Sequence, residues 1–137
     1  MVENREDTVT VTVGLGERSY DILIGSGLVT RAGAEIAARL PGVRAAIVTD
    51  RNVAASHLAP LKESLTAAGI ASAAIVVPPG EKSKDFSHLE QVVDGVLGAR
   101  LERGDVVIAL GGGVVGDLAG FAAGIVRRGM RFVQMPT

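Results

Sequence analysis

One short stretch of this sequence has the residue types and the spacing of a dinucleotide-binding turn. Residues 111–117 read Gly-Gly-Gly-Val-Val-Gly-Asp, follow the apolar run 106–110 and open a segment of small apolar residues. They satisfy the pattern G-x-G-x-x-G between a strand and a helix, where glycines let the backbone approach a pyrophosphate and free N–H groups at the helix start favour its negative charge. The sequence therefore predicts a phosphate-binding turn here, in preference to a tight turn that binds no ligand.

The residues around this turn argue against two better-known nucleotide sites. A Walker motif continues with Lys and then Ser or Thr, but Asp117 and Leu118 stand there, and a carboxylate would repel a γ-phosphate. An ordinary Rossmann site has an acid about 20 residues after its glycines to hold the ribose. No acid lies there, and the nearest one at a predicted strand end is Asp50, upstream. A dinucleotide would therefore lie across this domain differently from the usual Rossmann manner.

Three other groups of residues could contact a ligand, and each has a structural alternative. Asp50 could bond ribose hydroxyls with Asn52 beside it, or Asp50 could simply cap a helix. Glu81 and Lys84 could reach a cofactor, although by themselves they are more typical of a solvated loop. The pair 127–128, Arg-Arg, could bind a phosphate or carboxylate, or stabilise the end of a helix.

The elements that must position these residues alternate between strands and helices. An alternating Thr/Val segment, 8–13, and the segment 20–24 predict an antiparallel hairpin. The following pattern predicts helices over 28–40, 53–68, 86–99 (capped by Asp85 or Ser83) and 114–124, and strands over 45–48, 71–77, 106–110 and 131–135.

Such an order predicts a Rossmann-like, mostly parallel sheet with helices on both faces, plus the N-terminal hairpin, in one α/β domain over 1–137. The carboxyl ends of parallel strands share one rim, where ligands bind. Four polar or glycine-rich turns fall at that rim, namely residues 50–52, 79–84, 111–117 and 136–137.

Composition narrows the classes of function. With 47% hydrophobic residues but only 3% aromatic ones, the core must be built of Val, Ile, Leu and Ala. A net charge of −1 gives no basic stripe for nucleic acid, and no apolar run is long enough to span a membrane. There is no cysteine, and His57 and His88 lack a metal-ligand spacing, so no metal site is expected in this chain. The polar start is unlike a signal peptide, and the expected location is the cytoplasm.

Three blocks together give the chain a resemblance to a known family. Residues 78–84 (Pro-Pro-Gly-Glu-Lys-Ser-Lys), 111–121 and 128–137 (Arg-Gly-Met-Arg-Phe-Val-Gln-Met-Pro-Thr) closely resemble the 3-dehydroquinate synthases in order and spacing. The glycine block is shared with sugar-phosphate cyclase relatives and, more loosely, with glycerol dehydrogenases. The block 128–137 is the most specific.

The resemblance implies an NAD-dependent and zinc-dependent lyase of the shikimate pathway. Its substrate would be 3-deoxy-D-arabino-heptulosonate 7-phosphate and its products 3-dehydroquinate and phosphate. NAD⁺ would oxidise a ring hydroxyl, phosphate would leave after the adjacent C–H is acidified, the carbonyl would be reduced again, and an aldol step would close the ring. Arg128 would meet an anionic group of the substrate. The cofactor contacts would be Asp50, Asn52, Pro79, Gly80, Glu81, Lys82, Ser83, Lys84, Gly112, Gly113, Val114, Val115, Gly116, Asp117 and Thr137.

The resemblance also implies what this chain does not supply. The zinc (or cobalt) ligands of the family, one Glu and two His, and most catalytic lysines lie in a helical C-terminal domain beyond Thr137. The 137 residues are therefore expected to bind NAD without turnover, and the full-length protein to be a homodimer that contacts a small sugar phosphate, neither nucleic acid nor membrane. Two alternatives stay open: a related cyclase that makes an inosose or valiolone, and a stand-alone nucleotide-binding module.

Overall fold

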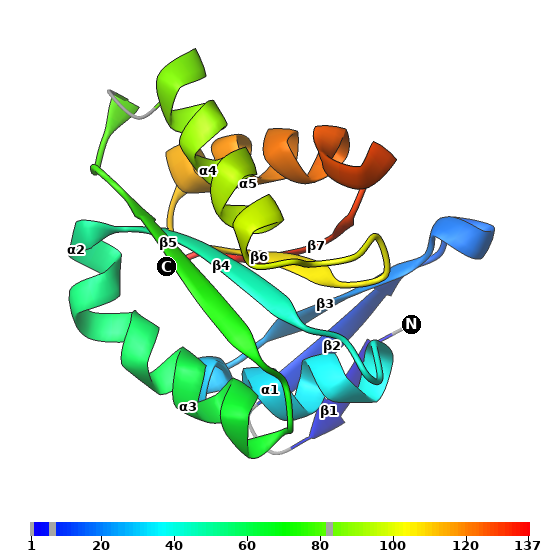
Figure 1. Ribbon diagram of the computed structural model, residues 1–137. Helices are drawn as coiled ribbons and strands as arrows, with labels where there is room; N and C mark the ends of the chain where they lie inside the picture. Colours follow the sequence, from blue (N-terminus) through cyan, green and yellow to red (C-terminus); the bar gives the residue numbers. More distant parts are fainter. Residues whose placement is uncertain (1, 6–7, 82–83) are drawn as a thin grey trace.

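Seven strands form two separate sheets in the residues that the computed structural model describes, which are 2–5, 8–81 and 84–137. Four of them make a parallel sheet in the order β5-β4-β6-β7 (Figure 1). Their bounds are β4 Ala45–Asp50, β5 Ser72–Val77, β6 Val106–Leu110 and β7 Arg131–Met135. The two central strands, β4 and β6, are buried almost throughout, as expected for uninterrupted apolar runs in a parallel sheet.

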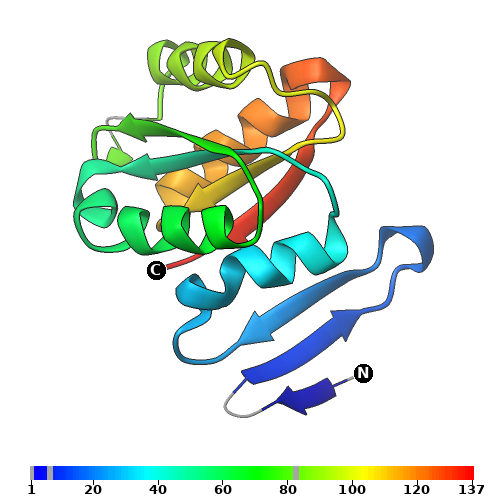
Figure 2. The ribbon, with the colours of Figure 1, turned by 60° about the horizontal axis from the view of Figure 1, so that its bottom comes forward.

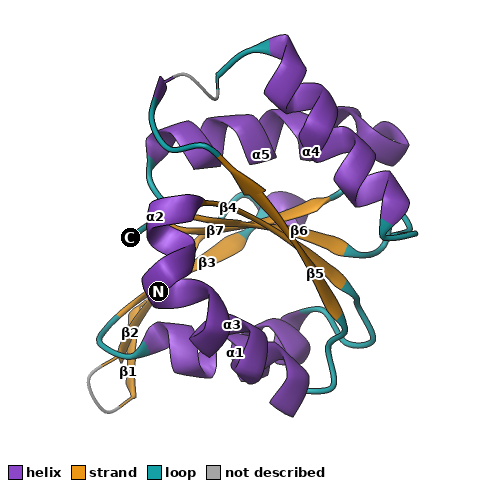
Figure 3. Ribbon diagram, turned by 60° about the vertical axis from the view of Figure 1, so that its left-hand side comes forward, coloured by secondary structure: helices purple, strands orange, loops and turns teal. Residues whose placement is uncertain are grey.

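Helices cover both faces of this sheet, as the sequence predicted (Figure 3). α1 (Leu28–Arg39) and α3 (Ala59–Ala67) lie on one face, and α4 (Phe86–Gly98) and α5 (Gly113–Ile125) on the other. Alternate strand residues serve the two cores: Ile47 and Ile108 pack toward α1 and α3, and Val48 toward α4 and α5. The core is aliphatic on both sides, which follows from the scarcity of aromatic residues.

The strand register brings the carboxyl ends of all four strands to one rim. Asp50 is paired with Val77, Thr49 with Leu110, and Leu110 in turn with Met135. The turns that follow these strands therefore lie side by side, as the sequence predicted, and β4 and β6, which carry Asp50 and the glycine turn, are direct neighbours.

The other three strands form a small antiparallel sheet in the order β1-β2-β3. The predicted hairpin is confirmed as β2 (Thr8–Val13) and β3 (Tyr20–Ile24), joined through the short helix η1 (Gly16–Arg18). A third strand, β1 (Val2–Arg5), extends it along β2. This sheet is the outermost layer of the molecule, and α1 separates it from the rest of the domain (Figure 2).

The predicted helix over 53–68 consists of three consecutive segments. α2 (Arg51–Val53) leads into the π-helical turn η2 (Ala54–Leu58), and α3 follows. The break precedes Pro60, which has no N–H to donate to the preceding turn, so the usual ladder cannot continue through it. The short helix η4 (Val126–Arg128) likewise ends α5 before β7. None of the described helices is long and apolar enough to cross a membrane.

Candidate functional site

The glycine turn after β6 is held in a conformation that only glycine adopts easily. Gly111 has φ +153°, and a Cβ there would lie 3.1 Å from the side chain of Val115. The Gly111 N–H donates to the Met135 carbonyl at 3.1 Å, which ties the turn to β7. Strain is therefore expected at Gly111 and not at Gly113, whose φ is not positive.

The helix that follows the turn differs from its neighbours at its amino end. Asp50 caps α2 by accepting from the Val53 N–H at 2.9 Å, and Asp85 caps α4 by accepting from the His88 N–H at 2.8 Å. α5 begins after Gly112, and no side chain of the described residues caps it. A Cβ at Gly112 or Gly113 would meet nothing within 4 Å. The amino end of α5 thus offers open space and N–H groups without a side-chain acceptor, the arrangement that suits an external anion.

Gln134 lies beneath this turn, and sequence reasoning missed it. It is paired with Ala109 in the register of β6 and β7, and its Nε2 would lie 2.8 Å from a Cβ built on Gly116. A larger residue at position 116 would force Gln134 to move, so glycine suits the place where α5 packs on β7. Side chains alternate along β7: Val133 and Met135 pack in the core beneath α1 and α3, so Gln134 between them points toward α5. This alternation was the only sequence signal for the position of Gln134.

A salt bridge joins the loop after β5 to the glycine turn. The Lys84 Nζ lies 2.8 Å from the Asp117 Oδ2, and both side chains are exposed. The hydrogen bond and the negative charge of Asp117 raise the pKa of Lys84, so this ammonium is charged throughout the physiological range. The structure thus brings a cation of the predicted 79–84 turn within reach of the start of α5.

An apolar hollow of about 310 Å³ lies beside this salt bridge, between α4 and α5. Four apolar side chains and three polar ones line it: Phe86, Leu89, Leu118 and Phe121 with Lys84, Asp85 and Asp117. Phe86 is 87% exposed and Phe121 60% exposed. A larger depression of about 490 Å³ lies at the opposite end of β6 and β7, around Arg103 and Arg131. We place the candidate site at the rim because the glycine turn and the polar loops meet there.

The remaining predicted cofactor residues are distributed unevenly around the rim. Asp50 uses one carboxylate oxygen for the helix cap, and Asn52 is exposed in α2. Val115 is buried, so only its backbone could face a ligand. The remaining residues lie in the turn or at strand ends: Pro79, Gly80, Glu81, Val114 and Thr137. Lys82 and Ser83 lie outside the described residues.

Arg128 is not brought to this rim. It belongs to η4, which follows α5, and the 13 residues of α5 lead about 20 Å away from the glycine turn. Arg127 precedes it with φ +52°. The side chain of Arg128 lies outside what the structure describes. Within one chain, an anion bound by Arg128 would therefore lie away from the phosphate-binding turn.

The described residues do not fit a zinc site. No group of three His, Cys, Asp or Glu side chains among them could hold a metal ion. His57 lies in η2, and the Nδ1 of His88 is 2.7 Å from Asp85 Oδ1, so the two histidines serve different elements. The contact with His88, through its N–H and its ring, also lowers the pKa of Asp85.

Sequence comparison identifies close relatives. The family model described as 3-dehydroquinate synthase N-terminal matches residues 74–137. A 3-dehydroquinate synthase of Mesorhizobium japonicum is 70% identical over 132 residues, and one of Brucella ovis is 69% identical over 131 residues. Each match covers 96% of this chain and 35% of the relative, so the chain spans about a third of the length of the curated relatives it matches.

Solved structures that share this fold include an inosose synthase and a valiolone synthase. A 2-deoxy-scyllo-inosose synthase superposes with a TM-score of 0.82 at 22% identity, over 93% of this chain and 36% of that one. The 2-epi-5-epi-valiolone synthase of Streptomyces hygroscopicus, solved with NAD⁺ and Zn²⁺ bound, gives 0.74 at 30% identity, over 90% of this chain and 34% of that one. The chain is therefore similar to 3-dehydroquinate synthases over about a third of their length, and its residues 74–137 match the N-terminal model of that family.

Proposed function

We propose that this chain is the NAD-binding part of a 3-dehydroquinate synthase. The full-length protein would be a carbon–oxygen lyase that converts 3-deoxy-D-arabino-heptulosonate 7-phosphate into 3-dehydroquinate and phosphate, in the shikimate pathway. The observation that carries the proposal is the amino end of α5, which lacks a side-chain cap, is open beside Gly112 and Gly113, and lies at the carboxyl rim of a parallel sheet. A chain 70% identical to it bears the name of that enzyme.

The residues around the turn have the chemistry that the two phosphates of a dinucleotide require. Backbone N–H groups at the start of α5 would hold the pyrophosphate, and the Lys84 ammonium would add a positive charge beside them. Asp50, on the neighbouring strand β4, would hold a ribose through the carboxylate oxygen that the cap leaves free. When bound, NAD would supply a reversible acceptor for hydride. The apolar hollow around Phe86 and Phe121 would exclude water from one side of the site.

The chemistry on the substrate would need groups from outside these 137 residues. The described residues do not fit the zinc ion that the family implies, so we assign them no part in metal chemistry. We expect the metal ligands and most substrate contacts to come from the remaining two thirds of the longer protein. Arg128 would contact an anionic group of the substrate, away from the pyrophosphate.

A related sugar-phosphate cyclase is the second candidate, because the inosose and valiolone synthases share this fold. The 70% identity to a 3-dehydroquinate synthase, against 30% to the valiolone synthase, favours the first candidate. A glycerol dehydrogenase superposes less well, with a TM-score of 0.57. A stand-alone nucleotide-binding module would bind NAD⁺ without any partner domain.

Release of phosphate tests the proposal. The longer protein, supplied with NAD⁺ and zinc, should release one phosphate from each 3-deoxy-D-arabino-heptulosonate 7-phosphate, and the 137-residue chain should release none. Activity of the short chain would mean that the catalytic groups are within it. A longer protein that releases no phosphate from this substrate but acts on a different sugar phosphate would instead be an inosose-type or valiolone-type cyclase. We further propose that the protein acts in the cytoplasm and that its full-length form is a homodimer.

A further inference from the structure

A depression of about 490 Å³ lies at the amino ends of β6 and β7. Two short segments line it, Arg103 and Gly104 before β6 and the residues from Gly129 to Arg131 at the start of β7. The five residues of β6 separate it from the glycine turn by about 17 Å. It is therefore a different feature from the candidate site at the carboxyl rim.

The turn over 102–105 holds the main chain of Arg103 in place. The Asp105 N–H donates to the Glu102 carbonyl at 3.0 Å, which closes the turn. The Asp105 carboxylate in turn accepts from the N–H groups of Glu102 and Arg44, at 2.8 and 2.9 Å. One wall of the depression is thus fixed by bonds within the protein, before any ligand binds.

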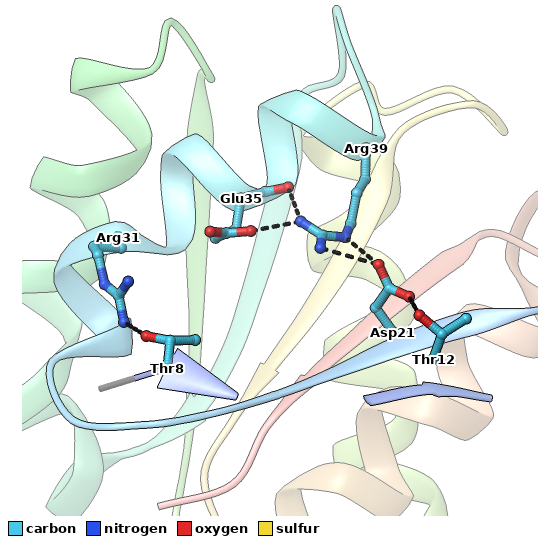
Figure 4. A network of polar contacts seen from close by, with 6 residues as sticks. All are labelled: Thr8, Thr12, Asp21, Arg31, Glu35 and Arg39. Carbon is cyan, nitrogen blue, oxygen red and sulfur yellow. Dashed lines mark hydrogen bonds and ion pairs between the residues drawn. The ribbon is translucent and has the colours of Figure 1, made fainter. Parts of the chain in front are cut away.

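Arginines that stabilise the fold of this protein have acceptors within it, as those of α1 show. Arg39 donates to Asp21 at 3.0 and 3.1 Å and to Glu35 at 2.6 Å (Figure 4). Arg31 donates to the Thr8 hydroxyl. Each of these two guanidinium groups therefore has a structural role that accounts for its position.

The two arginines of the depression differ from those of α1. Arg103 and Arg131 are exposed, and neither side chain forms a hydrogen bond or an ion pair with a residue in the described part of the chain. The carboxylate of Asp105 is already paired with the Arg44 guanidinium, 3.3 Å away. Two positive charges without a partner in the described residues thus line one depression.

The segments around the depression are basic, and its backbone is accessible. The stretches 100–105 and 127–131 contain five arginines and two carboxylates, whereas the whole chain has a net charge of −1. Such a concentration of one charge attracts ions of the opposite sign. A Cβ at Gly104 would meet nothing within 4 Å, and Gly129 has φ +105°, which favours glycine. Positive charge and open backbone therefore occur together here.

We propose that this depression binds a phosphate group between the side chains of Arg103 and Arg131. A guanidinium group donates two parallel hydrogen bonds to a phosphate or a carboxylate. Two separate guanidinium groups match the two charges and the several oxygens of a phosphate better than the single charge of a carboxylate. The volume is in the range of small-molecule pockets, so free phosphate and a phosphate monoester both fit. The proposal does not depend on the cofactor site.

Titration of the 137-residue chain with inorganic phosphate, followed by NMR of its backbone amides, tests the proposal. The signals of Gly104 and Gly129 should shift and saturate at millimolar phosphate, and chloride at the same ionic strength should not shift them. Arg103→Gln and Arg131→Gln should each weaken binding at least about threefold. Arg103→Lys, which keeps the charge but not the planar fork, should weaken it less.

Arg100→Gln is the matched control. Arg100 is exposed and lies three residues before Arg103, but it does not line the depression. Its substitution removes the same charge from the same edge and should leave the affinity for phosphate nearly unchanged. Circular dichroism verifies that each variant is folded. Glycerol phosphate distinguishes the two sources of the group: tighter binding than inorganic phosphate indicates a monoester as the ligand, and equal or weaker binding indicates free phosphate.

Three results would overturn the proposal. In the first, phosphate shifts only the signals of Gly112 and Gly113, which would place all phosphate binding at the amino end of α5. In the second, Arg100→Gln weakens binding as much as Arg103→Gln, so that the signals report only the general field of the basic edge. In the third, an acidic peptide shifts the signals of the depression and phosphate does not.

Discussion

The Lys84 Nζ lies 2.8 Å from the Asp117 Oδ2, and this contact joins two turns that are 33 residues apart in the sequence. The carboxylate neutralises a cation that the structure places beside the glycine turn. A bound pyrophosphate would compete with Asp117 for the same ammonium.

The charge of Lys84 is therefore expected to matter for binding. Lys84→Met should weaken binding of NAD⁺ and of inorganic pyrophosphate, and Asp117→Asn should strengthen binding of pyrophosphate because it frees Lys84. Both effects should shrink as salt is raised, since the two side chains are exposed. Calorimetric titration measures them, with Lys62→Met in α3 as the control. Equal pyrophosphate affinity of all four proteins would rule out a role for Lys84.

Gly113 and Gly111 are expected to respond differently to substitution. Gly113→Val should abolish binding of NAD⁺ and leave the fold intact, because the added methyl groups would fill only the open space at the helix start. Gly111→Val should destabilise the fold itself, since φ +153° is strained for any residue but glycine and the new Cβ would lie only 3.1 Å from the Val115 side chain. Thermal unfolding and NAD⁺ titration of both variants distinguish the two effects. Unchanged NAD⁺ affinity of Gly113→Val would mean that the glycine turn connects β6 to α5 without binding the cofactor.

Asp50 is expected to make the domain prefer NAD over NADP. A 2′-phosphate on the adenosine ribose would meet the negative charge of Asp50. Asp50→Asn removes this charge but keeps an oxygen for the Val53 N–H, because Asn and Asp are equally good helix caps. The variant should therefore unfold at the same temperature as the wild type while discriminating less between the two cofactors. If the wild type binds both equally, Asp50 does not hold the ribose.

Asp105 is expected to make stability depend on pH. Burial alone would raise its pKa, but the N–H groups of Arg44 and Glu102, at 2.9 and 2.8 Å, and the Arg44 guanidinium outweigh burial and lower it. A carboxyl with a lowered folded pKa stabilises the fold above its unfolded pKa of about 3.9, and this contribution is lost as the pH falls through the folded value.

Asp105→Ala should consequently lower the free energy of unfolding by about 1–3 kcal/mol at pH 7, because two N–H groups would lose their acceptor. The difference from the wild type should be smaller at pH 3. Urea denaturation at both pH values measures it, with the exposed Asp94→Ala as the control. A difference that does not change with pH would contradict the assigned ionisation.

The parallel sheet and its rim could be predicted because their signals are local. β6 and β7 were predicted over the residues they occupy, since an uninterrupted apolar run and an alternating one each stand between clear breaks. β1 was missed because two of its four residues, Glu3 and Arg5, are charged and only its pairing with β2 makes it a strand.

The contacts within the site were harder to predict because they join distant segments. Gln134 meets Gly116 only because α5 packs on β7, and Lys84 meets Asp117 only because α4 and α5 are neighbours. Nothing in the sequence indicated that Phe86 and Phe121 line one hollow, because only the packing of α4 against α5 brings them together. Of the two roles expected for Asp50, the helix cap is observed, and the contact with a ribose stays a prediction.

Direct titration of the 137-residue chain with NAD⁺, ADP-ribose and ATP tests the central claim, that the amino end of α5 holds the pyrophosphate of a dinucleotide. NAD⁺ and ADP-ribose share that pyrophosphate and both riboses, so both should bind, and ATP should bind more weakly because its γ-phosphate would meet the carboxylate of Asp117. Absence of NAD⁺ binding, or tighter binding of ATP than of NAD⁺, would contradict the account.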